Sequence, residues 1–395
     1  MSRNSKSADL KNIFMKIVYI TDSFAICGGI ERVLTDKMNY LAANYGYDVS
    51  LLTIYQGNHP FPFVLDERIR YIDIDVRNHQ QYEYSGLIKY YKKIKLRRLI
   101  KHRLISAISD IRPDIIVCVK IDMIGLMLSV RGGIPLVAES HTICRADEYE
   151  KNSFLHKAYL WFVKRKVRNL EALVALTDDD ASEWRHFSSH VFVIPNIVHP
   201  DESATNSKCQ SKSIMFVGRF SKQKNVVALL NIWENIFQRN PDWELHVYGE
   251  KGDIEETVYN RLIAAQEIGI VIHNPVKEHM LEEYKNHSVL VLTSVFEPFG
   301  LVITEAMSCG LPVVAYDCPY GPASIITDEK DGFLIKYGDE ACFVERLCQL
   351  MADASLRQEM GKYAIASSKR YAEDSIMPLW KKLFEDIINK NPKLC

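Results

Sequence analysis

The chain has 395 residues, of which 47% are hydrophobic and 25% are charged, and its formal net charge is −1. This composition is typical of an ordinary globular protein, and the length predicts two domains at ~100–200 residues each. The near-zero net charge provides no chain-wide attraction to nucleic acid. Residues 1–200 carry 28 Lys and Arg against 22 Asp and Glu, whereas the rest carries 21 against 28. This asymmetry indicates two units with different partners.

The nine cysteines give no sign of a disulfide framework or a metal site. Their number is odd, no two have C-x-x-C spacing, and most lie in apolar runs, so we expect reduced core residues of a cytosolic protein. No apolar run reaches the ~18 residues of a transmembrane helix. Residues 1–12 are polar and lack the apolar segment of a signal peptide.

The first half of the chain alternates short apolar runs with amphipathic stretches. The fold is expected to begin near Met15, with residues 1–14 as a disordered extension. A helical pattern covers residues 30–44. The apolar runs predict strands at 16–21, 48–53, 70–74, 115–119, 135–138, 172–175 and 191–194.

The second half repeats this alternation. Its apolar runs predict strands at 213–217, 244–248, 270–273, 289–292, 312–315 and 332–335. Near-continuous Val, Ile and Leu runs separated by helices are typical of a parallel sheet that is covered on both faces. Two such series predict an α/β protein with two doubly wound, Rossmann-like sheets.

A polar stretch without apolar periodicity, residues 199–212, separates the two series and is typical of a linker. We therefore expect an N-terminal domain over residues 15–198 and a C-terminal domain over 213–373. The tail, residues 374–395, has its apolar side chains on one face up to residue 390, which predicts an amphipathic helix.

The first glycine motif, Gly28-Gly29-Ile30-Glu31, follows the first predicted strand and opens a helix. Backbone N–H groups at a helix start favour an anion such as phosphate. The pattern is not G-x-G-x-x-G, so it does not support a dinucleotide fingerprint. Taken alone, it is also typical of an ordinary tight turn between a strand and a helix.

The second motif, Gly218-Arg219-Phe220 with Lys224, directly follows the strand predicted at 213–217. Arg offers a fork of donors to phosphate oxygens, and Lys adds a point charge. Ligands of open α/β sheets bind beyond the carboxyl ends of the strands. The pair therefore favours a diphosphate site over a merely solvated basic loop.

The third motif, Glu297-Pro298-Phe299-Gly300-Leu301-Val302-Ile303-Thr304-Glu305, follows the strand predicted at 289–292. Gly300 precedes a helix whose first N–H groups can face a phosphate. Glu305 lies about one turn into that helix, where its carboxylate suits hydroxyl groups rather than phosphate. Taken singly, each glutamate is also typical of a solvated side chain on a capped helix.

Together these residues resemble the signature of glycosyltransferase family 4. The resemblance spans roughly Lys16 to Tyr371 and rests first on Glu297-x7-Glu305 and the run that follows it. It also covers Gly28-Gly29-Ile30-Glu31, Gly218-Arg219-Phe220-x3-Lys224, Ile194-Pro195-Asn196, Gly321-Pro322 and Asp331-Gly332-Phe333-Leu334. The motifs are highly specific together, although none is specific alone.

The resemblance implies a GT-B fold, in which two Rossmann-like domains face each other across a cleft and the last helix crosses back to the N-terminal domain. It also implies that the C-terminal domain holds a nucleotide sugar. The implied nucleotide-sugar-binding residues are Gly28, Gly29, Gly218, Arg219, Lys224, Glu297, Phe299, Gly300, Leu301, Val302 and Glu305.

The resemblance assigns roles to most of these residues. Arg219 and Lys224 would bind the diphosphate, and the backbone around Gly300 would complete that site. Glu305 would bind the ribose hydroxyls, and Glu297 would contact the hydroxyls of the transferred sugar.

His141 follows the strand predicted at 135–138 and matches a cleft histidine of the family that contacts the sugar. A lone histidine is more often structural. The implied catalytic residues are Glu297, His141, Arg219 and Lys224. Many relatives carry a glutamate where this chain has Ser324, which loosens any inference about contacts there.

The implied reaction is the transfer, with retention of anomeric configuration, of a hexosyl unit from a UDP- or GDP-sugar to a glycan or lipid-linked acceptor in surface polysaccharide biosynthesis. Cationic side chains and helix N–H groups would stabilise the leaving diphosphate. No metal and no other cofactor is therefore expected. A nucleotide-sugar epimerase on the same fold and an inactive nucleotide-sugar-binding partner subunit are the alternatives.

The segment from Leu87 to Ile105 is the strongest local charge feature, with eight Lys and Arg, interleaved apolar residues and no acid. A basic amphipathic helix can lie on an anionic bilayer, at ~1 kcal/mol per Lys or Arg near the surface. The alternative is a surface helix that packs its apolar stripe on the first domain. Nucleic-acid binding has less support because no reader motif accompanies the charge. We expect a cytoplasmic protein held peripherally on the inner face of the cell membrane.

Overall fold

The computed structural model describes residues 15–26, 28–77, 85–149, 154–199, 207–277 and 280–390. The predicted extension at residues 1–14 lies outside these ranges, as do Cys27, Cys395 and residues 200–206 of the predicted linker. The seven described cysteines are thiols rather than disulfides, and five of them are buried.

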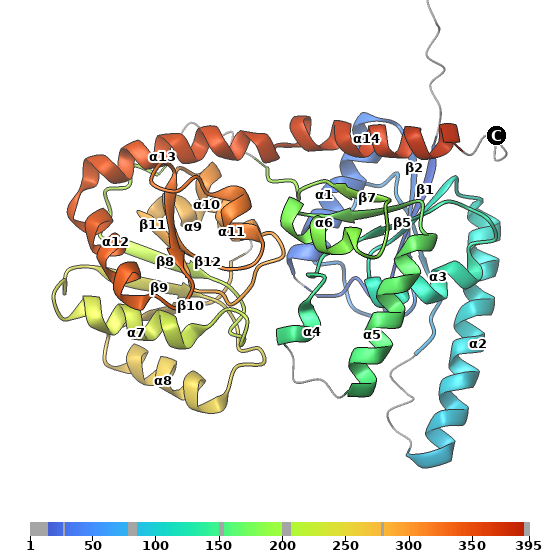
Figure 1. Cartoon of the computed structure of the whole chain (residues 1–395), viewed down its shortest axis with the longest axis horizontal. Coiled ribbons are helices and arrows are strands. Elements are labelled where there is room, and N and C mark those ends of the chain that lie inside the picture. The colour runs from blue at the N-terminus through green and yellow to red at the C-terminus, as the bar shows by residue number, and fades with distance from the viewer. Residues whose placement is uncertain are drawn as a thin grey trace, which may run out of the picture. The chain divides into compact units, whose positions relative to one another are not determined.

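The first sheet has seven strands in the order β3-β2-β1-β4-β5-β6-β7 (Figure 1). Strand β1 pairs in parallel with both β2 and β4. The strands are β1 (Lys16–Thr21), β2 (Asp48–Thr53), β3 (Arg70–Asp73), β4 (Ile115–Cys118), β5 (Leu136–Glu139), β6 (Ala172–Ala175) and β7 (Val191–Val193).

The second sheet has six parallel strands in the order β10-β9-β8-β11-β12-β13. These strands are β8 (Ser213–Val217), β9 (Glu244–Tyr248), β10 (Ile272–Asn274), β11 (Val289–Leu292), β12 (Val313–Asp317) and β13 (Gly332–Lys336). The prediction of an α/β protein with two doubly wound parallel sheets is confirmed.

Helices connect the strands of both sheets. Those of the first half are α1 (Gly29–Asn44), α2 (Gly86–Ile111), α3 (Ile124–Val130), α4 (Ala146–Tyr149), α5 (Phe154–Lys166) and α6 (Asp178–Arg185). Those of the second half are α7 (Val226–Phe237), α8 (Glu256–Glu267), α9 (Met280–Asn286), α10 (Leu301–Ser308), α11 (Gly321–Ile325), α12 (Glu340–Ala352), α13 (Ala354–Ser368) and α14 (Glu373–Lys390).

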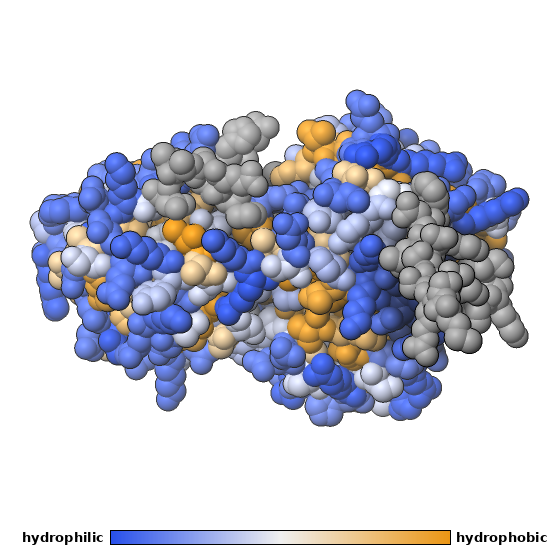
Figure 2. Space-filling model, turned by 90° about the horizontal axis from the view of Figure 1, so that it is seen from above, coloured by the Kyte–Doolittle hydropathy of each residue, from blue (hydrophilic) through white to orange (hydrophobic). Residues whose placement is uncertain are grey.

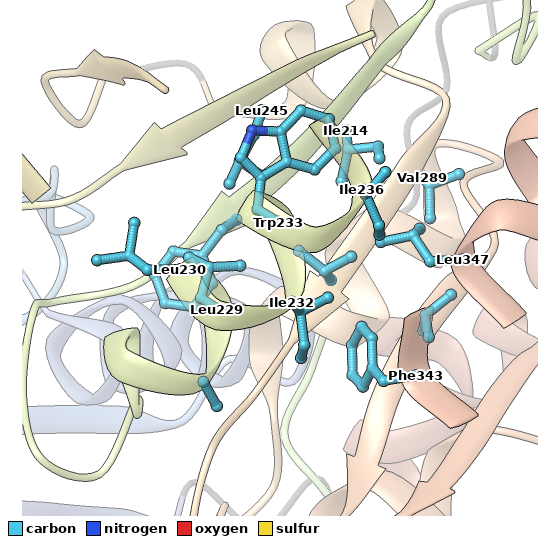
Figure 3. Packing of buried hydrophobic residues seen from close by; sticks show 14 of the residues in the cluster. Ile214, Leu229, Leu230, Ile232, Trp233, Ile236, Leu245, Val289, Phe343 and Leu347 are labelled. Atoms are coloured by element: carbon cyan, nitrogen blue, oxygen red, sulfur yellow. The ribbon is translucent and has the colours of Figure 1, made fainter. Parts of the chain in front are cut away.

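Apolar burial explains why these strands form parallel sheets. All four residues of β4, β5, β6 and β11 are buried, as expected for strands covered on both faces. In the second sheet, α7 packs Trp233 and Ile236 against Ile214 of β8, beside Phe343 and Leu347 of α12 (Figure 3). Burying each such side chain contributes about 1.5–3 kcal/mol. The face shown in Figure 2 is mostly hydrophilic, with hydrophobic residues in small patches.

One strand starts later than predicted because backbone groups at its predicted start have another partner. The strand predicted at 270–273 begins instead at Ile272. The N–H groups of Ile270 and Val271 donate to the carbonyl oxygen of Ala265, at the end of α8, at 2.9 and 3.3 Å. Those two residues therefore complete the helix terminus before the ladder of the sheet begins.

Residue contacts group the chain into two compact units, and α14 contributes to both. One unit comprises Met1–Glu139, Phe162–Ala172 and Leu383–Cys395, and the other comprises Ser140–Trp161 and Leu173–Lys382. Burial, and to a smaller extent the charge of Glu385 on α14, raises the pKa of Tyr47 in the first unit to about 12. The domain limits 15–198, 199–212, 213–373 and 374–395 stay predictions.

Candidate functional site

Two loops meet at the carboxyl edge of the second sheet because they follow neighbouring strands. The loop with Gly218, Arg219 and Lys224 follows β8, the loop with Glu297 follows β11, and β8 and β11 are adjacent. Between the loops, the N–H of Val295 donates to the carbonyl oxygen of Gln223 at 2.8 Å. The side-chain amide of Gln223 donates to the carbonyl oxygen of Phe296 at 3.0 Å. The second and third sequence motifs therefore form one structure.

Lys224 and Glu297 form an ion pair at the centre of this structure. Lys224 Nζ lies 2.5 Å from Glu297 Oε1, and Ser294 Oγ donates to the same oxygen at 2.6 Å. The Glu297 side chain is only 5% exposed and that of Lys224 is 15% exposed. The predicted ligand of the diphosphate and the predicted ligand of the sugar are thus held against each other. Burial of such a pair is tolerated because each charge has partners.

The backbone of Glu297 is fixed on both sides. Its N–H donates to the carbonyl oxygen of Pro319 at 2.6 Å, and its carbonyl oxygen accepts from the N–H groups of Tyr320 and Gly321 at 2.9 Å each. A Cβ atom on Gly321 would lie 1.8 Å from the carbonyl oxygen of Phe299. Only glycine therefore allows the start of α11 to approach the Glu297 loop this closely.

Glycines also bring the Arg219 loop close to the neighbouring strand end. A Cβ atom on Gly249, after β9, would lie 2.2 Å from the carbonyl oxygen of Gly218. One on Gly252 would lie 2.7 Å from Nε of Arg219, whose side chain is exposed. We did not identify Gly249 or Gly252 from the sequence, although a glycine directly after a strand is the signal that singled out Gly218.

The helix predicted after Gly300 begins at Leu301, as α10. Gly300 has φ +103°, a conformation that favours glycine. The N–H groups of Leu301 and Val302 precede the first bond of the helical turn, which Ile303 donates to Gly300 O at 2.9 Å. Those two N–H groups give the start of α10 a partial positive charge, on which its predicted role in binding phosphate depends.

Glu305 and Phe299 differ in their surroundings. Glu305 Oε2 accepts a hydrogen bond of 3.0 Å from the hydroxyl of Tyr284, a buried residue of α9 that the sequence motifs do not include. The Phe299 ring is buried and lies edge-on to the ring of Tyr371, with 5.3 Å between the ring centroids. This packing anchors the loop that carries Glu297, and the contact of Phe299 with a ligand stays a prediction.

The remaining predicted residues follow strands of the first sheet. Gly28 is the N-cap of α1 with an extended backbone, and Gly29 is the first residue of that helix. His141 follows β5 and is half-buried. At the end of β5, Glu139 forms a buried ion pair with Lys37 of α1. Burial lowers the pKa of Lys37, and the charge of Glu139 offsets part of this effect.

Cys318 is the thiol beside the Glu297 loop. Burial, and then the charge of Glu297, raises its pKa well above the ordinary value for cysteine. It is therefore a protonated structural residue rather than a nucleophile. Within the described ranges, no group of three or more His, Cys, Asp or Glu side chains has the arrangement needed to hold a metal ion.

Comparisons with known families match both halves of the chain. Residues 200–367 match the family model of glycosyl transferases group 1, and residues 27–202 match that of glycosyltransferase family 4. The amylovoran biosynthesis glycosyltransferase AmsD of Erwinia amylovora is 27% identical over 391 residues, which cover 95% of this chain and 99% of that protein. The lipopolysaccharide 1,6-galactosyltransferase of Escherichia coli K12 is 27% identical, with 86% of this chain and 89% of that protein covered.

Solved structures agree with the fold. The crystal structure of Anabaena HepE in complex with UDP and glucose superposes with a TM-score of 0.74 at 18% identity, covering 93% of this chain and 99% of that one. The prediction of the family and of the enzyme class is confirmed. The chain belongs to the glycosyltransferases of the group 1 and family 4 type, and it has the GT-B fold.

Proposed function

We propose that this glycosyltransferase moves a hexosyl unit from a UDP- or GDP-sugar to a glycan or lipid-linked acceptor during assembly of a surface polysaccharide. The observation that carries the proposal is the ion pair of Lys224 and Glu297, which neighbouring strands hold at a sheet edge. Relatives named for amylovoran biosynthesis and for lipopolysaccharide galactosyl transfer support the acceptor class. HepE, whose solved structure contains UDP and glucose, supports the donor class.

The proposed chemistry follows from the charges at the sheet edge. The bond between the sugar C1 and the diphosphate oxygen breaks, and the nucleoside diphosphate leaves with its negative charge. Lys224, Arg219 and the first N–H groups of α10 stabilise that charge. These groups supply the positive charge of the site, so we propose that transfer needs no metal. The acceptor hydroxyl adds to C1 on the face that the diphosphate left, and it gives its proton to the departing phosphate, so configuration is retained.

Glu297 is the fixed partner of the pair and Lys224 is the adjustable one. Ser294 and three backbone hydrogen bonds hold Glu297, whereas Lys224 reaches it through a flexible four-carbon chain. Without donor, Glu297 keeps the Lys224 ammonium at the sheet edge. With donor, Lys224 would share its three N–H donors between Glu297 and a phosphate oxygen, so the site would require little reorganisation.

Binding of the donor tests the site. A thermal-shift screen of UDP, GDP and their sugars should raise the melting temperature for one nucleotide, because a ligand at ~100 times its dissociation constant stabilises by ~2.7 kcal/mol. Lys224→Met should abolish the shift, whereas Lys212→Met should keep it, because Lys212 forms an exposed ion pair with Asp242. Equal shifts in all three proteins would overturn the site. The anomeric configuration of the product, read by NMR, tests retention.

We also propose that α2 holds the enzyme at an anionic membrane surface. Among the described side chains of α2, the buried apolar residues lie at Ile100 and beyond, whereas Ile88, Tyr90, Tyr91 and Ile94 are exposed. The first half of α2 thus extends away from the first sheet (Figure 1). Packing of α2 on the first domain, which is the alternative to membrane binding, therefore applies only to its second half. Within the described residues, no helix combines the length and apolarity needed to cross a bilayer.

Sedimentation with vesicles tests the role of α2. Replacing Lys92, Lys93, Arg97 and Arg98 by Ser should lower binding to vesicles that contain phosphatidylglycerol, by ~1 kcal/mol for each charge that lies near the surface. Equal binding of the variant and the unaltered protein at low salt would reject the proposal.

A further inference from the structure

His287 occupies a buried position at the amino edge of the second sheet, whereas the proposed nucleotide-sugar site lies at the carboxyl edge. It follows α9 and precedes β11, and only 3% of its surface is exposed. It lines a cavity of about 460 Å³ beside the first residues of β8 and β9 and the end of α9. The residues that line this cavity belong to none of the sequence motifs, so the cavity lies outside the site described above.

Both ring nitrogens of His287 have hydrogen-bond partners. Nδ1 lies 3.0 Å from Ser213 Oγ at the start of β8, and Nε2 lies 3.1 Å from the hydroxyl of Tyr248 at the end of β9. That hydroxyl donates its proton to Glu283 Oε2 at 2.8 Å, so it accepts from His287. Nε2 therefore carries the proton of the neutral ring, and Nδ1 accepts from Ser213. The neutral ring thus bridges two neighbouring strands.

A charged ring does not suit this position. A proton on Nδ1 would remove the acceptor to which Ser213 donates, and neither partner of the ring is a carboxylate. The ring of His246 lies edge-on, with 4.7 Å between the ring centroids, so positive charge on both rings is repulsive. Burial, and then the charge of His246, accordingly lowers the pKa of His287 to about 4.

The other charged groups near His287 do not stabilise a proton on it. They come from β9, α9 and the loops beside them, and they are joined in pairs, namely Lys212 with Asp242, His246 with Glu244, and Lys277 with Glu283. The charge of Glu283 favours a protonated His287 and that of Lys277 opposes it, so this pair has little net effect. A protonated His287 is therefore more stable where its ring has left the cavity for water.

The end of α9 connects His287 with the proposed nucleotide-sugar site. The N–H of His287 donates to the carbonyl oxygen of Tyr284 at 3.1 Å, so the two residues share the last turn of that helix. The hydroxyl of Tyr284 donates to Glu305 Oε2 at 3.0 Å, on the helix α10 against which α9 packs. Displacement of the His287 ring would therefore disturb the residue that orients Glu305.

We propose that His287 is a positioning residue for donor binding, whose neutral ring fixes the end of α9 and, through Tyr284, orients Glu305. Protonation releases the ring and lowers the affinity for the donor, so acid acts on the carboxyl edge of the sheet from the amino edge. This inference rests on the proposed function, because it takes Glu305 as a ligand of the donor.

Hydrogen exchange of the α9 amides tests the release without a ligand. A free histidine titrates near pH 6.5, so from there down to about pH 4 the released form gains up to tenfold over the bound form for each pH unit. Protection of the α9 amides, corrected for the chemical exchange rate, should fall accordingly. Amides of α12, which packs in the core on the other face of the sheet, should keep their protection.

Two variants control the exchange experiment. His287→Gln cannot take up the proton, so the protection of its α9 amides should depend much less on pH. His186→Gln, at an exposed histidine of the same unit, should behave like the unaltered protein. The same pH dependence in His287→Gln and the unaltered protein would overturn the proposal.

Nucleotide affinity tests the connection to Glu305. Binding of UDP and of GDP is measured by calorimetry at about pH 7.5 and 5.5, and the titration of the phosphate itself cancels when proteins are compared at one pH. The affinity of the unaltered protein should fall between these pH values by up to about tenfold more than that of His287→Gln. An equal fall in both proteins would contradict the role of His287.

A double-mutant cycle with Tyr284→Phe separates positioning from a general loss of stability. If His287 acts through the Tyr284 hydroxyl, both substitutions together should weaken nucleotide binding about as much as Tyr284→Phe alone. Additive losses would overturn the inference. Nucleotide binding that requires Lys224 but is indifferent to His287 would overturn the inference alone, whereas a protein that binds neither nucleotide at either pH would overturn the proposed function as well.

Discussion

Lys37 of α1 and Glu139 of β5 form an ion pair that is almost completely buried, although the two residues are 102 positions apart in the sequence. Removing one partner of such a pair leaves an uncompensated charge. Lys37→Met should therefore lower the free energy of unfolding by about 3–5 kcal/mol, measured by urea denaturation. Lys37→Met with Glu139→Gln should recover much of the loss. Lys16→Met, which removes an exposed pair with Asp48, should cost about 1 kcal/mol or less.

Substitutions in the ion pair of Lys224 and Glu297 should affect stability and activity separately. Lys224→Met should reduce kcat by about 10²–10³, because it removes a cation that stabilises the leaving group. It should also lower the melting temperature, since Glu297 keeps a nearly buried charge. Adding Glu297→Gln should restore the melting temperature but not kcat. Recovery of both quantities in the double variant would contradict a catalytic role for Lys224.

Tyr284 should act through Glu305. Tyr284→Phe removes the hydroxyl that donates to Glu305 Oε2 and keeps the ring in the core. Loss of one hydrogen bond of about 0.5–1.5 kcal/mol should weaken donor binding by roughly twofold to twelvefold, measured by calorimetry. Tyr371→Phe is the matched control, because its hydroxyl donates to the carbonyl oxygen of Ser324 instead. If the control weakens binding equally, the specific contact with Glu305 is not responsible.

Gly321 should tolerate no side chain. Gly321→Ala would bring a Cβ atom to 1.8 Å from a backbone oxygen, so the Glu297 loop must shift. The expected destabilisation is well above the ~1 kcal/mol typical of single substitutions, and donor binding should weaken in parallel. Gly125→Ala should be near neutral, because its Cβ meets only the flexible end of Lys166 within a helix that favours alanine.

Acid should destabilise the second sheet through His287. Burial, and then the charge of His246, lowers the pKa of His287 to about 4, whereas an unfolded histidine titrates near 6.5. Between these values the unfolded state binds more protons than the folded state, so stability falls as pH drops from about 6.5 to 4, by roughly 3 kcal/mol at most. His287→Gln should flatten this dependence in melting curves. His186→Gln, at an exposed histidine, should leave it unchanged.

The strands could be predicted from the sequence because parallel sheets require continuous apolar runs, which are local features of the sequence. It also placed Arg219 and Glu297 at strand ends. It could not show that β8 and β11 are neighbours, and strand order is what brings Lys224 and Glu297, 73 positions apart, into contact.

The residues that support the site and the first sheet could not be predicted, for the same reason. Ser294, Tyr284 and Lys37 look ordinary in their local segments, and only tertiary contacts give them partners. The basic pattern of α2 was visible, but the point at which its burial begins, Ile100, depends on the surface that it packs against. The local sequence therefore predicts the secondary structure of a segment, whereas the contacts of its side chains depend on tertiary packing.

Helix α14 contributes residues to both units, and this affects how the chain folds during synthesis on the ribosome. Leu383, Phe384, Ile387 and Ile388 are buried and belong to the unit that begins with β1. These side chains are translated long after β1, so the core of that unit is complete only once α14 has been made. The second sheet can close first, and a stop codon before residue 383 would leave the first unit, rather than the second, without part of its interior.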